Sequence, residues 1–332
     1  MRSLVRAAAS SRASAAVIGT LERFDHGRSH LLPVLGYHRV ADPASEAGAH
    51  RGLCVPPQAF AEQLDALSAR HDVISLSDLL DVRRGQFRLP RRALLITFDD
   101  GYDDFASTAW PMLRERALPA ALFVPTAYPD TDRWFWWDRL AELLMLDTGR
   151  EAISSPLGTL PVRTEEERRR AFAALRTEYK RMSLAGVTGY LEELAKEVGA
   201  APGRGRTLGW DALRQLATEG VAIAAHSENH PILTTLPDDE LHEELRSSRA
   251  AGEREIGIDV PCFAYPSGAH DARVVAAAES AGFELAFATR RGINDLRRPR
   301  WMSLARINVG SRTSSTLVRA QVGSWMALQG AR

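Results

Sequence analysis

Short apolar runs alternate with amphipathic segments along most of the chain. RALLITF (92–98) and PAALFVPT (119–126) are nearly continuous apolar runs, which are typical of short strands buried on both faces. In the segment 56–70, Phe60, Leu64 and Leu67 are spaced four and three residues apart, which predicts a helix with one buried face. This alternation indicates a parallel α/β protein.

The same alternation extends over both halves of the chain. A helix is predicted to begin at Ser77 and to end at Gly85. Further strands are expected at 31–40, 221–226, 261–266, 283–289 and 304–309, and further helices at 103–118, 210–220, 237–257 and 271–282. About seven or eight such units, with short and regularly spaced strands, favour closure into a barrel.

Residues from about 128 to 206 do not follow this alternation. The region opens with the aromatic cluster WFWWDRL (134–140), continues through charge-rich helix patterns and ends in GAAPGRGR. We interpret it as a helical insertion within a barrel domain over 31–315. An N-terminal extension (1–30) precedes this domain, and a C-terminal tail (316–332) follows it.

Composition changes this picture little. The 332 residues include 42 Lys and Arg against 42 Asp and Glu, so net charge gives no reason to expect a nucleic-acid partner. Two cysteines, Cys54 and Cys262, are too few for a disulfide scaffold, and the sequence leaves open whether they pair. No apolar run reaches the roughly 18 residues of a transmembrane helix. Oligomeric state is left open.

The N-terminus has an unusual composition. The first 21 residues contain three arginines, four serines and no acid, as targeting segments often do. Because Arg6 and Arg12 interrupt its apolar residues, we favour a short exposed helix over a secretory signal. The sequence therefore favours a cytoplasmic location, with peripheral contact to a membrane surface left open by the arginines.

Four polar clusters each follow the end of a predicted strand. They are the Tyr-His pair 37–38, the acid pair 99–100, the segment 226–230 with a histidine at each end, and the segment 265–268. In parallel α/β barrels, active sites are built at the C-terminal ends of the strands. Their common position indicates one site to which all four clusters contribute.

The segment AHSENHP carries two histidines four residues apart. On a helix or in a tight turn, this spacing directs the imidazoles of His226 and His230 to the same side. Two imidazoles and one carboxylate form a metal site with open positions, which suits zinc and several other divalent ions. The alternative is a surface turn with two unrelated histidines.

The segment TFDDG ends a buried strand on two adjacent acids. Asp99 and Asp100 cannot both be buried and ionised without compensation, because like charges raise each other's pKa. A divalent cation compensates one of them and leaves the other as a general base. Gly101 allows a sharp turn after the pair. The alternative, helix capping, accounts for Asp103 and Asp104, and we assign no catalytic role to either.

With these motifs in order, the chain resembles a known family. TFDDGYDD, HSENHP and FAYPSG resemble the signature of the polysaccharide deacetylase (NodB-homology) family, carbohydrate esterase family 4. GYHRV near the start and LARINV near the end are similar to the branch with an N-terminal Tyr-His motif, which includes poly-N-acetylglucosamine deacetylases. The resemblance covers residues 31–310.

The resemblance implies a fold and a chemistry. The fold is a distorted (β/α) barrel of the NodB type, and the reaction is metal-dependent hydrolysis of an N-acetyl group on an amino sugar or polysaccharide. By position, Asp99 is the general base, and Asp100, His226 and His230 hold the metal. The metal is usually Zn²⁺, with Co²⁺, Ni²⁺ and Mn²⁺ as alternatives. The backbone N–H of Ser267 corresponds to the oxyanion donor.

Two departures from the family pattern concern the acid and the partner of the base. Many members supply a general acid from a C-terminal histidine, but no histidine follows His270 here. His38 is the natural substitute, the alternative being a structural histidine. Many members also pair the base with an arginine in the FAYPSG motif, which is absent here. Arg306 is our candidate partner for Asp99, the alternative being an ordinary ion pair.

Two other functions are weighed against the deacetylase. One is an amidase of the same superfamily that acts on a small non-sugar amide. The other is a catalytically weak protein that keeps the fold for carbohydrate binding or assembly. The presence of Asp99, Asp100, His226, His230 and His38 argues against a protein that has lost catalysis.

Overall fold

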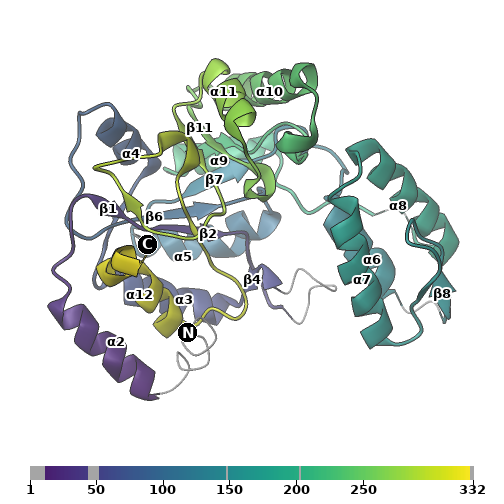
Figure 1. Cartoon of the computed structure of the whole chain (residues 1–332), viewed down its shortest axis with the longest axis horizontal. Coiled ribbons are helices and arrows are strands. Elements are labelled where there is room, and N and C mark those ends of the chain that lie inside the picture. Colours follow the sequence, from purple (N-terminus) through teal and green to yellow (C-terminus); the bar gives the residue numbers. More distant parts are fainter. Residues whose placement is uncertain (1–11, 44–51, 147–148, 202, 330–332) are drawn as a thin grey trace.

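One parallel sheet organises the molecule, with helices packed around it (Figure 1). The structure is a computed structural model that describes residues 12–43, 52–146, 149–201 and 203–329. The strand order is β12-β11-β10-β7-β6-β2-β14, with β5 beside the first half of β6, and every pair is parallel. The strands are β2 (Val34–Tyr37), β5 (Asp72–Ile74), β6 (Ala93–Phe98), β7 (Ala121–Val124), β10 (Ala222–Ala225), β11 (Cys262–Ala264), β12 (Leu285–Phe287) and β14 (Ile307–Asn308). The predicted parallel α/β architecture is confirmed.

The sheet curls because one segment contacts both of its ends. β14 pairs with β2, while Leu304, three residues earlier, forms a parallel bridge with Phe287 of β12. The Leu304 N–H donates to the carbonyl of Ala286, and its carbonyl accepts from Ala288 N–H, both at 2.9 Å. The segment 304–308 therefore draws the two edge strands together, as a distorted barrel requires.

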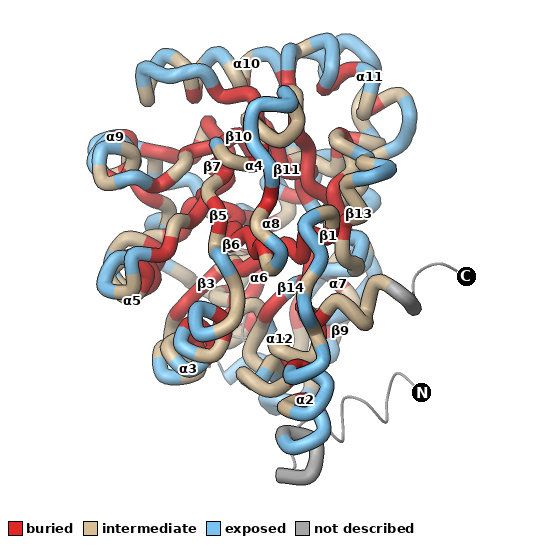
Figure 2. The backbone as a smooth tube through the Cα atoms, turned by 90° about the vertical axis from the view of Figure 1, so that its left-hand side faces the viewer, coloured by how far each residue is buried: buried red, intermediate tan, exposed pale blue. Residues whose placement is uncertain are grey.

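Alternation along β6 separates the barrel interior from the helix layer. Leu94, Ile96 and Phe98 pack toward the surrounding helices, whereas Ala93 and Leu95 belong to the interior cluster. Figure 2 shows the strands as mostly buried, with exposed residues on the outer faces of the helices. Because side chains alternate between the two faces along β6, the side chain of Asp99, which follows the strand, points toward the interior at the mouth of the barrel.

The helices of the barrel agree with the predicted pattern, with local differences. They are α3 (Pro57–Ser68), α4 (Leu76–Arg83), α5 (Trp110–Arg114), α9 (Trp210–Thr218), α10 (Asp238–Ile256), α11 (Ala272–Ser280) and α12 (Ser315–Val322). Ser75, not Ser77, caps α4, because its hydroxyl accepts from Asp78 N–H. A π-helix over Phe105–Ala109 precedes α5, where Pro111 supplies no backbone donor.

Helices near the two ends of the described chain pack against each other beside the barrel. Part of the predicted C-terminal tail is α12, which packs on α3 and on the N-terminal helix α2 (Arg12–Phe24). Two short strand pairs lie outside the main sheet: β1 (Leu31–Leu32) with β13 (Asn294–Asp295), and β3 (Arg39–Val40) with β4 (Cys54–Val55). Among the described residues, no helix is long and apolar enough to span a bilayer. Cys54 and Cys262 are both buried and are not joined by a disulfide.

A helical region projects from one side of the barrel between β7 and α9 (Figure 1). It contains α6 (Trp136–Met145), α7 (Glu165–Tyr179), α8 (Leu184–Val198) and the hairpin β8 (Ala152–Ile153) with β9 (Leu160–Pro161). Thr164 and Ser183 cap α7 and α8, and Gly199 ends α8 in the left-handed region. Its helices bury an apolar cluster of their own.

Candidate active site

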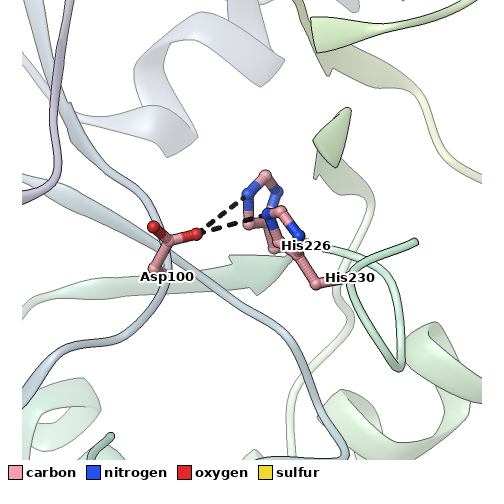
Figure 3. A group of neighbouring side chains, drawn as sticks. All are labelled: Asp100, His226 and His230. Carbon is pink, nitrogen blue, oxygen red and sulfur yellow. Dashed lines mark ion pairs between the residues drawn. The ribbon is translucent and has the colours of Figure 1, made fainter. Parts of the chain in front are cut away.

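A buried acid and two buried histidines lie together at the mouth of the barrel (Figure 3). Asp100 Oδ1 is 3.4 Å from Nε2 of both His226 and His230. One potential ligand atom from each residue lies within 4.8 Å of the others. The structure thus brings together the three predicted metal ligands from the loops after β6 and β10.

Left-handed backbone conformations, not a helix, direct these side chains. Asp100, Ser227 and His230 have φ values of 75°, 65° and 57°, which are uncommon for residues other than glycine. The Ser227 hydroxyl accepts from His230 N–H at 2.9 Å, and His226 N–H donates to the carbonyl of Val124 at 3.0 Å. Such conformations persist only where surrounding contacts determine them, as at functional sites.

The protonation pattern fits a cation between the three side chains. Nδ1 of His226 lies 2.7 Å from the carbonyl of Ala264, which can only accept, so Nδ1 carries the proton and Nε2 faces Asp100. Burial and neighbouring His226 lower the pKa of His230 to about 4, so its imidazole is neutral. Burial lowers the pKa of His226, but its hydrogen bond to Asp100 and the charges of Asp99 and Asp100 more than offset this, so the pKa is raised. When the Nε2 proton of His226 is absent, two neutral imidazoles and a carboxylate form a donor set for a divalent metal.

The start of the helical region packs directly on one of these histidines. The rings of Trp137 and Phe135 approach His230 edge-on, with centroids 4.7 and 5.7 Å away. The Trp137 indole N–H donates to the Tyr102 hydroxyl at 3.0 Å, and that hydroxyl donates to Asp138 at 2.7 Å. The sequence shows the aromatic cluster but not this contact, which links residues about 100 positions apart.

Asp99 is held by the arginine that was its candidate partner. Arg306 is fully buried and binds the carboxylate with two nitrogens, Nη1 to Oδ1 at 2.6 Å and Nη2 to Oδ2 at 2.7 Å. Its Nε donates to the carbonyl of Ala288 at 3.1 Å. Burial alone raises the pKa of Asp99, but the Arg306 guanidinium more than offsets this, so the pKa lies below its usual range.

Of the Tyr-His pair, only the histidine faces the acids. His38 follows β2, its side chain is 16% exposed, and its Nε2 lies 3.9 Å from Asp99 Oδ2. Tyr37 is buried on the other side, where its hydroxyl donates to Gln63 at 2.9 Å. His38 is therefore at the mouth, close to Asp99 and accessible to solvent.

Asp104 has a role that capping does not describe. Its side chain makes no cap hydrogen bond at the following helix. Instead, the buried carboxylate accepts from Arg39 Nε at 2.6 Å and from Val40 N–H at 2.9 Å. Burial raises its pKa, and Arg39 only partly opposes this. The capping interpretation is wrong for Asp104, because it anchors the two residues that follow His38.

Ser267 lies past the end of β11, three residues beyond Ala264. Its φ is 56°, and its carbonyl accepts from Thr289 Oγ1 at 3.2 Å. This bond directs the Ser267 carbonyl to Thr289 and not to the acid–histidine cluster. Nearby His270 stacks on Tyr265, with ring centroids 4.7 Å apart.

Comparisons with known proteins agree with the motifs and the fold. The chain matches the model of the polysaccharide deacetylase family over residues 88–286. Over 98 residues it is 31% identical to the poly-beta-1,6-N-acetyl-D-glucosamine N-deacetylase of Escherichia coli strain K12, a match covering 29% of this chain and 14% of that relative.

Solved structures share the fold at low sequence identity. The Streptococcus pyogenes deacetylase PplD aligns with a TM-score of 0.59 and 17% identity, covering 88% of this chain and 98% of that one. IcaB from Ammonifex degensii aligns with a TM-score of 0.59 and 19% identity, covering 90% and 99%. The curled parallel sheet is therefore an architecture common to these proteins.

Proposed function

This chain belongs to the polysaccharide deacetylase family, and we propose that it is a metal-dependent hydrolase that removes N-acetyl groups from an amino sugar or polysaccharide. The observation that carries the proposal is the buried cluster of Asp100, His226 and His230 directly beside Asp99. The family places the activity among hydrolases of amide bonds.

Asp100, His226 and His230 are the residues that would hold the ion, with Zn²⁺ as the expected metal and Co²⁺, Ni²⁺ or Mn²⁺ as alternatives. Such an ion, when bound, polarises a carbonyl oxygen and lowers the pKa of a bound water. Asp99 and His38 stand outside this donor set. Both remain available for proton transfer.

The side chains around the cluster fit the two proton transfers that amide hydrolysis requires. Asp99, ionised and oriented by Arg306, accepts a proton from the attacking water. His38 donates a proton to the leaving nitrogen as the C–N bond breaks, giving acetate and a free amine. The backbone N–H of Ser267 is the proposed donor to the developing oxyanion.

The substrate class follows from the relatives. A curated relative is named as a poly-beta-1,6-N-acetyl-D-glucosamine N-deacetylase, so β-1,6-linked N-acetylglucosamine oligomers are the first substrates to test. No observation in the described structure favours a small non-sugar amide. The arrangement of Asp99 with Arg306 and the acid–histidine cluster also argues against a purely binding role.

Acetate release from these oligomers by metal-reconstituted protein tests the proposal. We expect Asp99→Asn to reduce kcat by about 10²–10⁴-fold with metal content unchanged. Asp103→Asn, in the same motif but paired with Arg206 at 3.8 Å, is the matched control and should keep wild-type activity. Absence of acetate release by the wild type on every glycan tried would refute the function, and an active Asp99→Asn would refute the assigned base.

A second variant tests whether His38 acts as a general acid or as a metal ligand. His38→Ala should lower kcat by about 10²-fold or more while the bound metal stays stoichiometric, because His38 lies outside the donor set. Loss of metal from this variant would make His38 a ligand and would remove it from the proton-transfer role.

A further inference from the structure

A second surface lies at the opposite end of the barrel from the acid–histidine cluster. β6 runs from one surface to the other. Arg92 and Ala93, at its start, line a hollow at the N-terminal end of the strand, whereas Asp99 and Asp100 follow its C-terminal end. At about 3.3 Å per residue, the strand separates the two surfaces by roughly 20 Å. This second surface has no part in the proposed reaction.

The helix α2 presents an apolar stripe on this surface. Val17, Leu21 and Phe24, spaced four and three residues apart, are 60%, 43% and 76% exposed. Ile18 and Glu22, on the adjacent face, are buried against the body. Seven large apolar side chains are exposed among the described residues, and three of them lie on this helix. Their concentration on one face is unlike scattered surface residues.

A basic hollow adjoins the helix. Its ionisable lining comprises Arg28, Arg70, Arg91, Arg92 and Arg319 together with Glu22, Asp25 and His71. With His71 neutral, five arginines against two acids leave an excess of three positive charges. Both acids are engaged internally, because Glu22 pairs with Arg319 and Arg70, and Asp25 accepts from Ser324. The whole chain has a formal charge of zero, so this excess is local.

From these two features we propose that this end of the molecule docks on the surface of an anionic lipid bilayer. An exposed apolar helix face inserts among acyl chains, while arginines bind lipid phosphates, often with two nitrogens. In the sequence, three arginines and no acid precede Glu22, a composition typical of segments that bind anionic lipid. A second copy of the chain would present the same positive hollow, so self-association through this face opposes like charges.

Vesicle co-sedimentation of the full chain tests the proposal. At low salt, the protein should bind vesicles of phosphatidylcholine with 30% phosphatidylglycerol at least about tenfold more tightly than pure phosphatidylcholine vesicles. Raising the salt to about 0.5 M should reduce this preference, since exposed charges are then screened. Equal binding to both vesicles, or no binding to either, would overturn the proposal.

Variants locate the surface. The triple change Val17→Ser, Leu21→Ser and Phe24→Ser should weaken binding at least about tenfold. A matched control changes other exposed apolar residues to serine and should bind like the wild type: Phe87, Leu157 and Ile258. If the triple variant folds poorly, Phe24→Ser alone, at the most exposed of the three positions, tests the same contact.

Two further outcomes count against the surface. If the control triple loses binding as strongly as the α2 triple, the contact is nonspecific. If the α2 triple instead converts a dimer to a monomer in light scattering, the stripe is a self-interface. Acetate release from soluble oligomers should be the same for all these variants, so failure of docking and failure of the proposed function are distinguishable.

Discussion

The two ends of the barrel differ in how their charged side chains are compensated. At the C-terminal ends of the strands, Asp99 and Asp104 are buried and each is matched by an arginine of this chain. At the other end, five arginines face two acids around an open hollow beside exposed apolar residues. At the first end these buried acids have partners within the chain, whereas the second end presents charge and apolar area that an external partner would cover.

This difference has an energetic reason. Burying a charge is costly unless a partner with good geometry compensates it, and removing one partner of a buried pair costs about 3–5 kcal/mol. Exposed pairs contribute only about 0–1 kcal/mol, so side chains there are free to serve binding. Changes at the mouth should therefore affect stability and chemistry together, and changes to exposed residues at the other end should affect association alone.

The largest expected effect is at the metal ligands. His226→Ala removes one of three donors, so we expect loss of the bound ion and a fall in acetate release of about 10³-fold or more. Metal content by atomic emission and kcat/KM on the same preparation measure both. A chelator should have the same effect on the wild type, and added Zn²⁺ should reverse it. Full activity of metal-free protein would contradict the assignment.

The Asp99–Arg306 pair should be the next most sensitive feature. Arg306→Ala leaves a buried carboxylate without its partner and should lower the free energy of unfolding by about 3–5 kcal/mol. Arg28→Ala, at the basic hollow, should change it by less than about 0.5 kcal/mol. Urea denaturation measures the free energy of unfolding of both variants. Equal losses would contradict the proposed difference between the two ends.

Substitution of Asp104 tests whether its bonds to Arg39 and Val40, the two residues after His38, matter for the reaction. Asp104→Asn keeps the shape but weakens the bonds to Arg39 and Val40, and should cost about 1–3 kcal/mol of stability. We expect a lower kcat with little change in KM and unchanged metal content. A change in KM alone would assign Asp104 to substrate binding instead.

Trp137 tests the contact between the helical region and the site. Trp137→Phe removes the donor to Tyr102 and part of the surface against His230, so metal affinity should fall about tenfold. Trp134→Phe, in the same aromatic cluster, is the control, because the Trp134 ring faces the Arg139 guanidinium and not His230. Competition with a metal indicator measures the affinity of both variants.

The smallest expected effect is on the stability of the α2 triple variant. Because Val17, Leu21 and Phe24 are exposed, their replacement by serine should change the free energy of unfolding by less than about 0.5 kcal/mol per site while vesicle binding is lost. A large loss of stability in urea denaturation would mean that the stripe packs against the protein itself.

The architecture and the acid–histidine cluster were predictable because both leave local patterns. Continuous apolar runs indicate buried parallel strands, and polar residues after several strand ends must meet at one edge. Arg306 could be named because the motif that usually supplies an arginine lacks one. What was missed depends on distant contacts: Asp104 with Arg39, 65 positions away, and Trp137 with His230 leave no periodic signal. The left-handed turns at Asp100 and His230 occur at residues whose types do not require them.

The closure of the sheet has a consequence for when the chain becomes active. Asp99, Asp100, His226 and His230 are all synthesised before residue 231, but Arg306 belongs to the segment that joins β12 to β2. Under the roles proposed, a chain truncated before this segment could gather its cation ligands yet leave the base unoriented. Under these roles, hydrolysis would require the chain to be synthesised and folded through the segment that contains Arg306.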